Sequence, residues 1–293
     1  MGKFGVRITG ARMRDCKAIA EIYEDAGFES IWVPDHLALP VEMPTDYPYR
    51  SDGTLPFGTD VALYDPWLWL SYLAAATERV KLATGVFILP LRHPLPTARS
   101  LVTLDRLSGG RAVLGIGVGW LDAEFDWVGQ AFKDRGRRTD ATIRALRALW
   151  TEDVTEVHDE FFDFGPTRFR PKPVHRSIPI EIGGKSAAAL RRTAELGDGW
   201  IEVGSRTVDV FGERVRDLHG RRAELGRTGP FEVTVSDRSL LKAATGFKEL
   251  FDAGATRIVV DPPRSPAGAI EVDQLAEWAK AFARDNILPL ADA

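Results

Sequence analysis

Residues 80–120 read VKLATGVFILPLRHPLPTARSLVTLDRLSGGRAVLGIGVGW and decide the fold. An apolar run over 80–89 precedes a helical pattern that begins at Pro94 and ends at Gly109-Gly110, and a second apolar run covers 112–118. Glycine directly after the last helical residue is typical of a helix C-terminus. Two apolar runs joined by a helix predict two parallel strands, and their continuously apolar character predicts burial on both faces.

The same alternation of strand and helix patterns extends from this stretch to both ends of the chain. Besides 80–89 and 112–118, runs typical of strands cover 4–8, 30–33, 178–182, 199–203, 231–236 and 256–261, and a helical pattern follows each. These repeats predict an α/β fold of the (β/α)8 TIM-barrel type, with an open doubly wound sheet as the structural alternative. Because no Pro/Gly/Ser-rich linker interrupts the repeats, we expect a single domain over residues 1–293.

Two segments fall outside the repeats. Residues 37–65 are rich in Pro, Gly, Tyr and Asp, and a loop of that length inside a compact domain is more often functional than idle. We interpret it as an active-site lid at the carboxyl ends of the strands, where barrels carry their active sites. Residues 158–173 are aromatic and proline-rich, which predicts a small inserted hairpin or loop.

Composition narrows the function to chemistry on small molecules. The formal charge of −4 and the pI near 5.8 argue against a nucleic-acid-binding protein, which would need a basic surface. The single cysteine, Cys16, excludes an internal disulfide and a cysteine-based zinc site. No motif for a metal site, a serine hydrolase or a nucleoside triphosphatase is present. Since neither a membrane span nor a signal sequence is visible, we expect a cytoplasmic protein.

Glycines at strand ends supply two candidate binding elements. Gly115, Gly117 and Gly119 close the run over 112–118, either to let neighbouring strands approach or to let a flat ring lie against bare backbone. The motif Gly183-Gly184-Lys185-Ser186 ends a strand and starts a helix, so unpaired amide groups and the helix dipole could hold a phosphate. A tight turn with a serine cap is the alternative interpretation of this motif.

Polar and aromatic side chains after three strands are candidates for catalysis and substrate binding. Asp35-His36 follows the second strand, where a histidine next to a carboxylate can act as acid, base or hydrogen-bond donor. His93, after the third strand, is interpreted as a loop anchor or pocket wall. After the fourth strand, Trp120 could line a substrate pocket while Glu124 relays protons. The alternative is a buried indole and a glutamate that favours the helix dipole.

Three runs of the chain, taken in order, resemble the bacterial luciferase-like family, and especially its branch of coenzyme F420-dependent oxidoreductases. The runs are TGVFILPLRHPLPTARSLVTLDRLSGGRAVLGIGVGWLDAEF, RRTDATIRALRALW and IPIEIGGKSAAALRRTAELGDGW. The resemblance extends from about Phe4 to Val260 and is weaker after Gly204. It implies a (β/α)8 barrel that binds a flavin or deazaflavin at the carboxyl ends of its strands, and it implies a homodimer.

The resemblance also implies roles for individual residues. A non-proline cis peptide that backs the cofactor ring would lie at Gly85-Val86, with Thr84 and Gly119 also in the cofactor site. Asp35 would contact the cofactor, and His36 would be catalytic, with Glu124 as a second catalytic candidate. Gly183, Gly184, Lys185 and Ser186 would hold the cofactor phosphate. Trp120 stands where the sugar-phosphate dehydrogenase branch has an acidic residue, so a sugar phosphate is not the expected substrate.

The leading hypothesis is an F420-dependent oxidoreductase that moves a hydride between the deazaflavin C5 and a small apolar organic substrate. His36 would donate a proton or a hydrogen bond at the reacting centre. One alternative is an FMN-dependent monooxygenase of the same family. Others are a barrel that binds a flavin-like ligand without turnover and a phosphate-binding lyase or isomerase.

Overall fold

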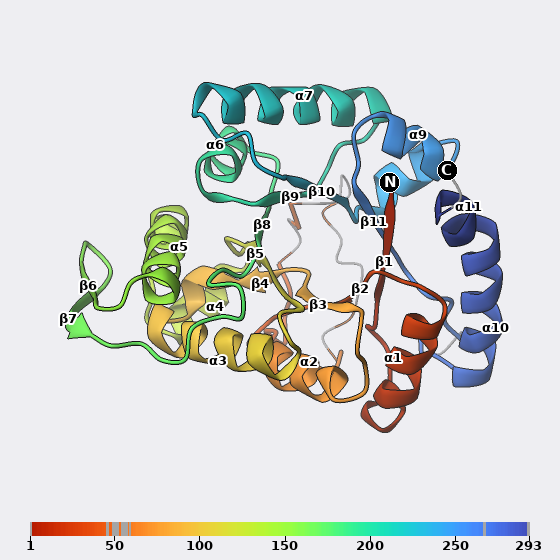
Figure 1. Cartoon of the computed structure of the whole chain (residues 1–293), viewed down its shortest axis with the longest axis horizontal. Helices are drawn as coiled ribbons and strands as arrows, with labels where there is room; N and C mark the ends of the chain where they lie inside the picture. The colour runs from red at the N-terminus through yellow and green to blue at the C-terminus, as the bar shows by residue number, and fades with distance from the viewer. Residues whose placement is uncertain are drawn as a thin grey trace.

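The computed structural model describes residues 2–44, 47–48, 53, 58, 60–265 and 268–291. Within this part of the chain, parallel strands close into a barrel surrounded by helices, which confirms the (β/α)8 prediction (Figure 1). The strand order is β3-β2-β1-β11-β10-β9-β8-β5, and pairing of β3 with β5 closes the ring. The strands are β1 (Lys3–Arg7), β2 (Ser30–Val33), β3 (Lys81–Thr84), β5 (Ala112–Gly117), β8 (Ile180–Gly183), β9 (Gly199–Glu202), β10 (Glu232–Val235) and β11 (Arg257–Val260).

The expected strand over 80–89 is interrupted. Strand β3 ends at Thr84, and a two-residue strand β4 (Phe87–Ile88) follows and pairs with β5. Between them the Gly85-Val86 peptide is cis, at the position that the family resemblance implied. The interruption lies at the carboxyl end of the barrel, so it exposes backbone where the family places its cofactor.

Helices follow the strands and cover the outside of the barrel. The longer ones carry one apolar stripe each, which packs on the strands. The helices are α1 (Cys16–Asp25), α2 (Pro66–Ala74), α3 (Pro94–Leu107), α4 (Asp122–Trp127), α5 (Arg135–Thr151), α6 (Ala187–Leu196), α7 (Val208–Glu224), α8 (Arg238–Ala243), α9 (Phe247–Asp252), α10 (Val272–Phe282) and α11 (Leu288–Ala291). Helix α8 and the C-terminal extension through a π-helical turn (Ala283–Ile287) into α11 were not predicted. Among the described residues, no helix is long and apolar enough to cross a membrane.

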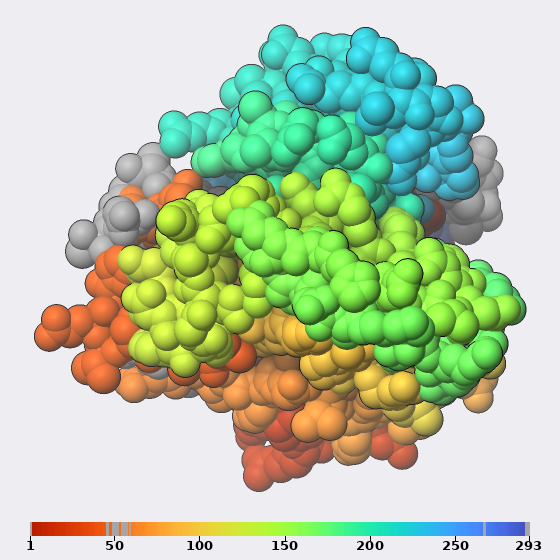
Figure 2. Space-filling view, turned by 90° about the vertical axis from the view of Figure 1, so that its left-hand side faces the viewer, coloured from red at the N-terminus to blue at the C-terminus, as the bar shows by residue number. Residues whose placement is uncertain are grey.

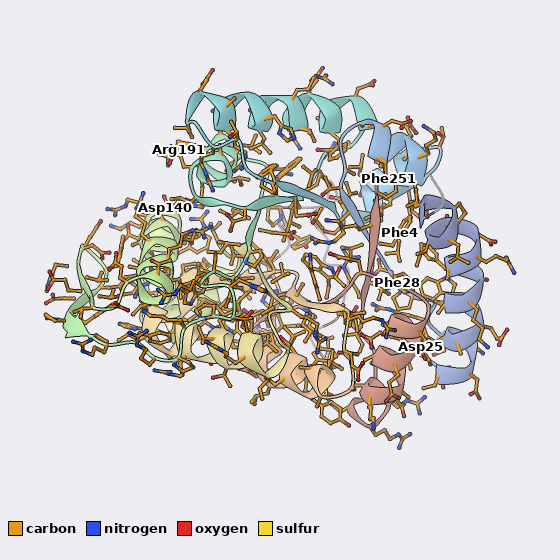
Figure 3. All side chains as sticks on the ribbon, viewed as in Figure 1. Phe4, Asp25, Phe28, Asp140, Arg191 and Phe251 are labelled. Atoms are coloured by element: carbon orange, nitrogen blue, oxygen red, sulfur yellow. The ribbon has the colours of Figure 1, made fainter. Side chains whose placement is uncertain are left out.

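Strand residues alternate between the helix layer and the barrel interior, as the two-residue period of a strand requires. Phe4 of β1 points outward and contacts Phe251 of α9 with ring centroids 5.6 Å apart (Figure 3). Its neighbour Gly5 points inward, where an added Cβ would lie 2.7 Å from Trp32 Nε1. Trp32 belongs to a separate buried cluster, which fills the interior with side chains from five strands. The cluster contains Trp32, Ala83, Val113, Ile201 and Val259.

A buried ion-pair network closes the barrel below this cluster. Arg257, at the start of β11, is 0% exposed and donates to Glu29 Oε2 at 2.8 Å and to Glu181 Oε1 at 2.6 Å. Although burial opposes it, Arg257 lowers the pKa of Glu29 to about 2. Glu29 is therefore ionised at neutral pH, and the amino end of the barrel is filled by protein groups.

The segment expected as an insertion forms an antiparallel hairpin, β6 (Thr155–His158) and β7 (Asp163–Thr167). Figure 2 shows these green residues on the molecular surface. The tip of the hairpin packs on the first turns of α3 and α5. The ring centroids of Phe162 and His93 are 5.3 Å apart, and the Arg138 guanidinium lies 5.0 Å from the Phe162 ring. The hairpin therefore extends the wall around the carboxyl end of the barrel. The expected lid, 37–65, lies partly outside the described residues.

Candidate active site

Three glycines lie at the carboxyl ends of three neighbouring strands, β3, β5 and β8, and other protein groups pack closely against them. An added Cβ at Gly85 would lie 2.9 Å from Trp32 Cε3, and one at Gly117 would lie 2.7 Å from Val86 Cγ2. One at Gly183 would lie 3.4 Å from Val86 Cγ1. We call Gly85, Gly117 and Gly183 the glycine shelf. A side chain at Gly85 would collide with Trp32 and one at Gly117 with Val86, so these positions require glycine, and the Trp32 and Val86 side chains lie against them.

Gly115 has a different role. Its added Cβ would lie 2.0 Å from the Thr84 carbonyl oxygen, so β3 and β5 touch backbone to backbone. The Thr84 hydroxyl, which is fully buried, donates to the Gly115 carbonyl at 2.7 Å. Thr84, which the sequence assigned to the cofactor site, therefore holds the two strands together beneath the shelf. Of the two roles weighed for the glycine run, Gly115 serves strand packing.

The loop between β8 and α6 lies next to the shelf. Gly184 has a φ of +137°, a conformation that favours glycine. Its carbonyl accepts from Trp200 Nε1 at 2.9 Å, which fixes the turn. Ser186 caps the helix, its hydroxyl accepting from Ala189 N at 3.1 Å, and the side chains of Lys185 and Ser186 are exposed. The first amide groups of α6 have no partner within the helix, so the loop suits a phosphate.

His36 and Glu124 come together although they are 88 residues apart. His36 Nδ1 lies 2.9 Å from Glu124 Oε2, and Glu124 Oε1 accepts from the Leu37 backbone at 2.7 Å. Glu124 is 0% exposed. Nδ1 is the ring nitrogen that bonds Glu124, and Nε2 faces away from it. The two residues proposed for catalysis therefore form a carboxylate–histidine pair.

Aromatic side chains stand beside this pair. The Trp120 ring lies edge-on to His36 with centroids 6.3 Å apart, and Tyr47 lies edge-on to Trp120 at 5.0 Å. The neighbour of Tyr47, Pro48, accepts from Lys185 Nζ at 3.2 Å through its carbonyl. The described residues of the expected lid thus contact two strand ends, that of β5 through Trp120 and that of β8 through Lys185.

Asp35, which the resemblance places in the cofactor site, is held by protein groups. Its side chain is fully buried, and Arg92 binds it through both guanidinium ends, at 2.6 and 2.7 Å. The Ile88 backbone donates to the same carboxylate at 2.9 Å. Both carboxylate oxygens thus bond to protein groups, so Asp35 fixes the segment that follows β3. Its partners are distant in sequence, and the motif alone could not reveal them.

His93 and Gly119 are also placed by packing. His93 caps α3, its Nδ1 accepting from Leu95 N at 3.2 Å, and its ring contacts the hairpin residues Phe162 and Phe164. Of the two interpretations of His93, loop anchor describes these contacts. Gly119 has a φ of +81°, and an added Cβ would lie 2.8 Å from Phe125. Both residues shape the rim of the site.

Sequence reasoning missed a charged cluster at the ends of β1, β10 and β11. Arg7 Nη1 lies 3.0 Å from Asp261 Oδ2, and Arg238 binds both oxygens of Asp261, at 2.6 and 3.0 Å. Arg264 donates to the Thr9 hydroxyl at 2.6 Å. Although burial opposes it, Arg238 and Arg7 lower the pKa of Asp261 to about 2. We call Arg7, Arg238 and Arg264 the arginine group.

Sequence reasoning also missed Glu202 at the end of β9. The side chain is fully buried, its Oε1 accepts from Ser205 N at 2.6 Å, and Oε2 has no hydrogen-bond partner. Burial raises the pKa of Glu202 to about 7. Trp200, two residues earlier on β9, points outward and stacks on Phe211 of α7. Glu202 lies on the same face of the strand, so it faces the helix layer and supports the loop that follows β9.

The family model described as luciferase-like monooxygenase matches residues 3–241 of this chain. An uncharacterized protein of Mycobacterium tuberculosis is 35% identical over 244 residues, covering 83% of each chain. The FMNH2-dependent dimethylsulfone monooxygenase of Pseudomonas putida is 31% identical over 157 residues, covering 53% of this chain and 43% of that protein. The F420-dependent glucose-6-phosphate dehydrogenase of Amycolatopsis mediterranei is 26% identical over 230 residues, covering 76% and 62%.

Solved structures share the fold over nearly the whole chain. A monooxygenase from Streptomyces bottropensis superposes with a TM-score of 0.76 at 19% identity, covering 98% of this chain and 99% of that one. The coenzyme F420-dependent tetrahydromethanopterin reductase of Methanopyrus kandleri gives a TM-score of 0.72 at 18% identity, covering 98% of both chains. At these identities the likeness concerns the fold.

Proposed function

The chain belongs to the luciferase-like monooxygenase family, and from this premise we propose that it is an F420-dependent oxidoreductase acting on a small organic substrate. Family members are oxidoreductases and monooxygenases, and relatives named for F420 and for FMN both resemble this chain. The single observation that carries the proposal is the glycine shelf, with its cis peptide, directly beside the β8–α6 loop.

The residues present fit a tricyclic ring with a phosphate tail. The shelf offers a surface from which side chains are excluded at Gly85 and Gly117, and Val86 lies between the ends of β5 and β8. The β8–α6 loop would hold the phosphate through the first amides of α6 and the Ser186 hydroxyl, with Lys185 adding a positive charge. Because Gly183 adjoins Val86 and begins this loop, ring and phosphate would occupy one continuous surface.

When bound, F420 supplies hydride exchange at C5 of its deazaflavin ring. The protein's part is to orient the substrate and to supply or accept a proton. Glu124 orients His36 through Nδ1, so the substrate would exchange a proton with Nε2. Trp120, edge-on to His36, would limit the space for the substrate and exclude water.

An FMN-dependent monooxygenase is the second candidate function, and the similarity to the dimethylsulfone monooxygenase favours it. The shelf and the phosphate loop suit either ring. Equilibrium titration with F420 and with FMN, followed by the fluorescence of each cofactor, separates the two. We expect F420 to bind more tightly, and binding of FMN alone would reverse the order.

Two glycine variants test the site itself. Gly117→Ala places a methyl group against Val86, whereas Gly220→Ala on α7 meets nothing within 4 Å and serves as the matched control. We expect Gly117→Ala to weaken F420 binding by at least about 10-fold, the cost of a small misfit in a close contact, and Gly220→Ala to leave it unchanged. If wild type binds neither F420 nor FMN, the proposed function is wrong. If bound reduced F420 is reoxidised by a substrate panel no faster than by buffer, the barrel binds without turnover.

A further inference from the structure

The mouth of the barrel has two unlike halves. Around the ring of strands, β3, β5 and β8 lie opposite β10, β11 and β1, respectively. The first three end in the glycine shelf. At the ends of the other three lie Arg7, Asp261 and Arg238. A ligand resting on the shelf would therefore face the arginine group across the mouth.

The alternation of strand residues directs part of this group into the mouth. On β1, Gly5 faces the interior, and so does Arg7 two residues later. Beyond β11 the same holds for Asp261, two residues after the interior residue Val259. The Arg7–Asp261 ion pair confirms this arrangement, and the side chains are 19% and 20% exposed. The Arg7–Asp261 pair thus lies in the mouth and is partly exposed to solvent.

Positive charge exceeds negative charge in this half. Among the described residues, Arg7 and Arg238 share Asp261 as their ion-pair partner, and Arg264 bonds a neutral hydroxyl. The carboxylate of Asp237, which precedes Arg238 in the chain, accepts from the backbone N–H groups of Gly204 and Ser239. The pKa of Arg7 is held below its ordinary value by burial and by the charges of Arg238 and Arg264. Three cations therefore face two carboxylates, and the cations repel one another.

The guanidinium groups retain donors for a ligand. Arg238 uses Nε and one Nη on Asp261, and Arg264 uses one Nη on Thr9, whereas each guanidinium carries five N–H donors. The group also adjoins the catalytic pair. Tyr47, which contacts Trp120, lies within electrostatic range of Arg238 and helps its Asp261 hydrogen bonds to raise the pKa of Arg238. One path of side chains therefore leads from His36 through Trp120 and Tyr47 to Arg238.

We propose that the substrate carries an oxyanion, a carboxylate or a phosphate, and that Arg238 and Arg264 bind it beside the Arg7–Asp261 pair. The inference rests on the proposed function and adds an anionic group to the small organic substrate. Arginine suits this task because its planar donors match both oxyanions. In the proposed function the β8–α6 loop across the mouth holds the cofactor phosphate, and we therefore assign this second oxyanion to the substrate.

The test measures binding of inorganic phosphate and of acetate to the protein saturated with F420, by NMR titration. The variants are Arg238→Gln and Arg264→Gln, both at exposed side chains, with Arg144→Gln on α5 as the matched control. Arg7 is left intact because it is mostly buried. We expect Arg238→Gln and Arg264→Gln each to weaken binding of at least one probe by about 10-fold or more, as loss of a charge-assisted hydrogen bond predicts. Arg144→Gln and the F420 affinity of every variant should match wild type.

The outcomes separate the sources. Binding of phosphate indicates a phosphorylated substrate, and binding of acetate indicates a carboxylate. Oxyanion binding that is absent, or equal in all variants, overturns the proposal, and so does an arginine variant that loses F420 affinity instead. If wild type does not bind F420, the proposed function has failed. The same titration of the protein alone then still decides whether the arginine group binds oxyanions.

Discussion

The carboxylate–histidine pair gives the sharpest prediction, and Glu124→Gln is the change that tests it. Glutamine has the shape of glutamate, and its oxygen can still accept from the Leu37 backbone, as Oε1 does at 2.7 Å. Its NH2 group would then face His36 Nδ1. In the wild type, this nitrogen lies 2.9 Å from Glu124 Oε2. A donor opposite Nδ1 favours the reversed tautomer and opposes the doubly protonated ring. Glu124→Gln should therefore impair proton transfer while the fold survives.

The size of the effect follows from the bond that is lost. Glu124 is fully buried, so its hydrogen bond to a protonated His36 is charge-assisted and shielded from water. Such bonds contribute about 1.5–3 kcal/mol, which corresponds to about 10- to 150-fold in rate. His36→Ala removes the proton-transferring group itself and should reduce turnover at least about 100-fold. Because Glu124 acts through His36, the double variant should be no slower than His36→Ala alone.

The assay is single-turnover reoxidation of reduced F420 by a substrate panel, with F420 affinity measured in parallel. Glu213→Gln, at an exposed glutamate on α7, is the matched control. F420 affinity should be unchanged in Glu124→Gln, and its pH–rate profile should shift relative to wild type. Wild-type turnover in Glu124→Gln would refute the reasoning. So would a double variant slower than His36→Ala by the full Glu124→Gln factor, since the two residues would then act independently.

Three further predictions concern stability. Arg92→Met leaves the buried Asp35 carboxylate without its partner and should lower the free energy of unfolding by about 3 kcal/mol, as measured in urea, with Asp35→Asn in the same chain restoring part of the loss. Burial raises the pKa of Glu202 from 4.5 to about 7. Its contribution to the free energy of unfolding is therefore fully present below a pH of about 4.5 and is lost as the pH rises through 7. Glu202→Gln should therefore raise the Tm at pH 8 more than at pH 5, and equal changes would contradict this. Glu29 has a pKa of about 2, so its contribution is present above pH of about 4.5 and lost as the pH falls toward 2. Glu29→Gln should flatten that acid loss of unfolding free energy.

Local patterns in the sequence were sufficient to predict the barrel. The helix from Pro94 to Leu107 and the strand from Ser30 to Val33 have the predicted bounds, because proline, glycine and apolar runs mark them without help from distant residues. Helix α8 was missed because it is short and follows β10 at once, so its pattern is obscured by the strand. The break between β3 and β4 could not come from hydrophobicity, since the whole run is apolar, and only the family resemblance indicated it.

Side-chain roles were predictable where the partner is near in sequence. Ser186 was expected either to cap a helix or to bind phosphate, and its hydroxyl does accept from Ala189, three residues on. The bonds of Asp35 could not be predicted, because its partner, Arg92, is 57 residues away and nothing in the motif shows that the carboxylate is enclosed. His36 and Glu124 were both proposed for catalysis, but that they touch depends on β2 and β5 flanking β3 in the closed ring.

The difference between the two halves of the mouth follows from the two-residue period of a strand. In a barrel, residues two apart on a strand face the same side, so an interior residue in the middle of a strand identifies the residue at its carboxyl end that enters the mouth. Four strands follow this rule, each with an interior residue two positions before the residue that enters the mouth: Gly5 and Arg7, Val259 and Asp261, Gly115 and Gly117, and Glu181 and Gly183. Strands β5 and β8 thus end in glycine, whereas charged residues lie at the ends of β1 and β11. A barrel whose mouth bound only an apolar substrate would gain nothing from burying Arg7 there, because a buried cation loses hydration that a single shared carboxylate restores only in part. That desolvation is the physical reason to look for a second anion at this site.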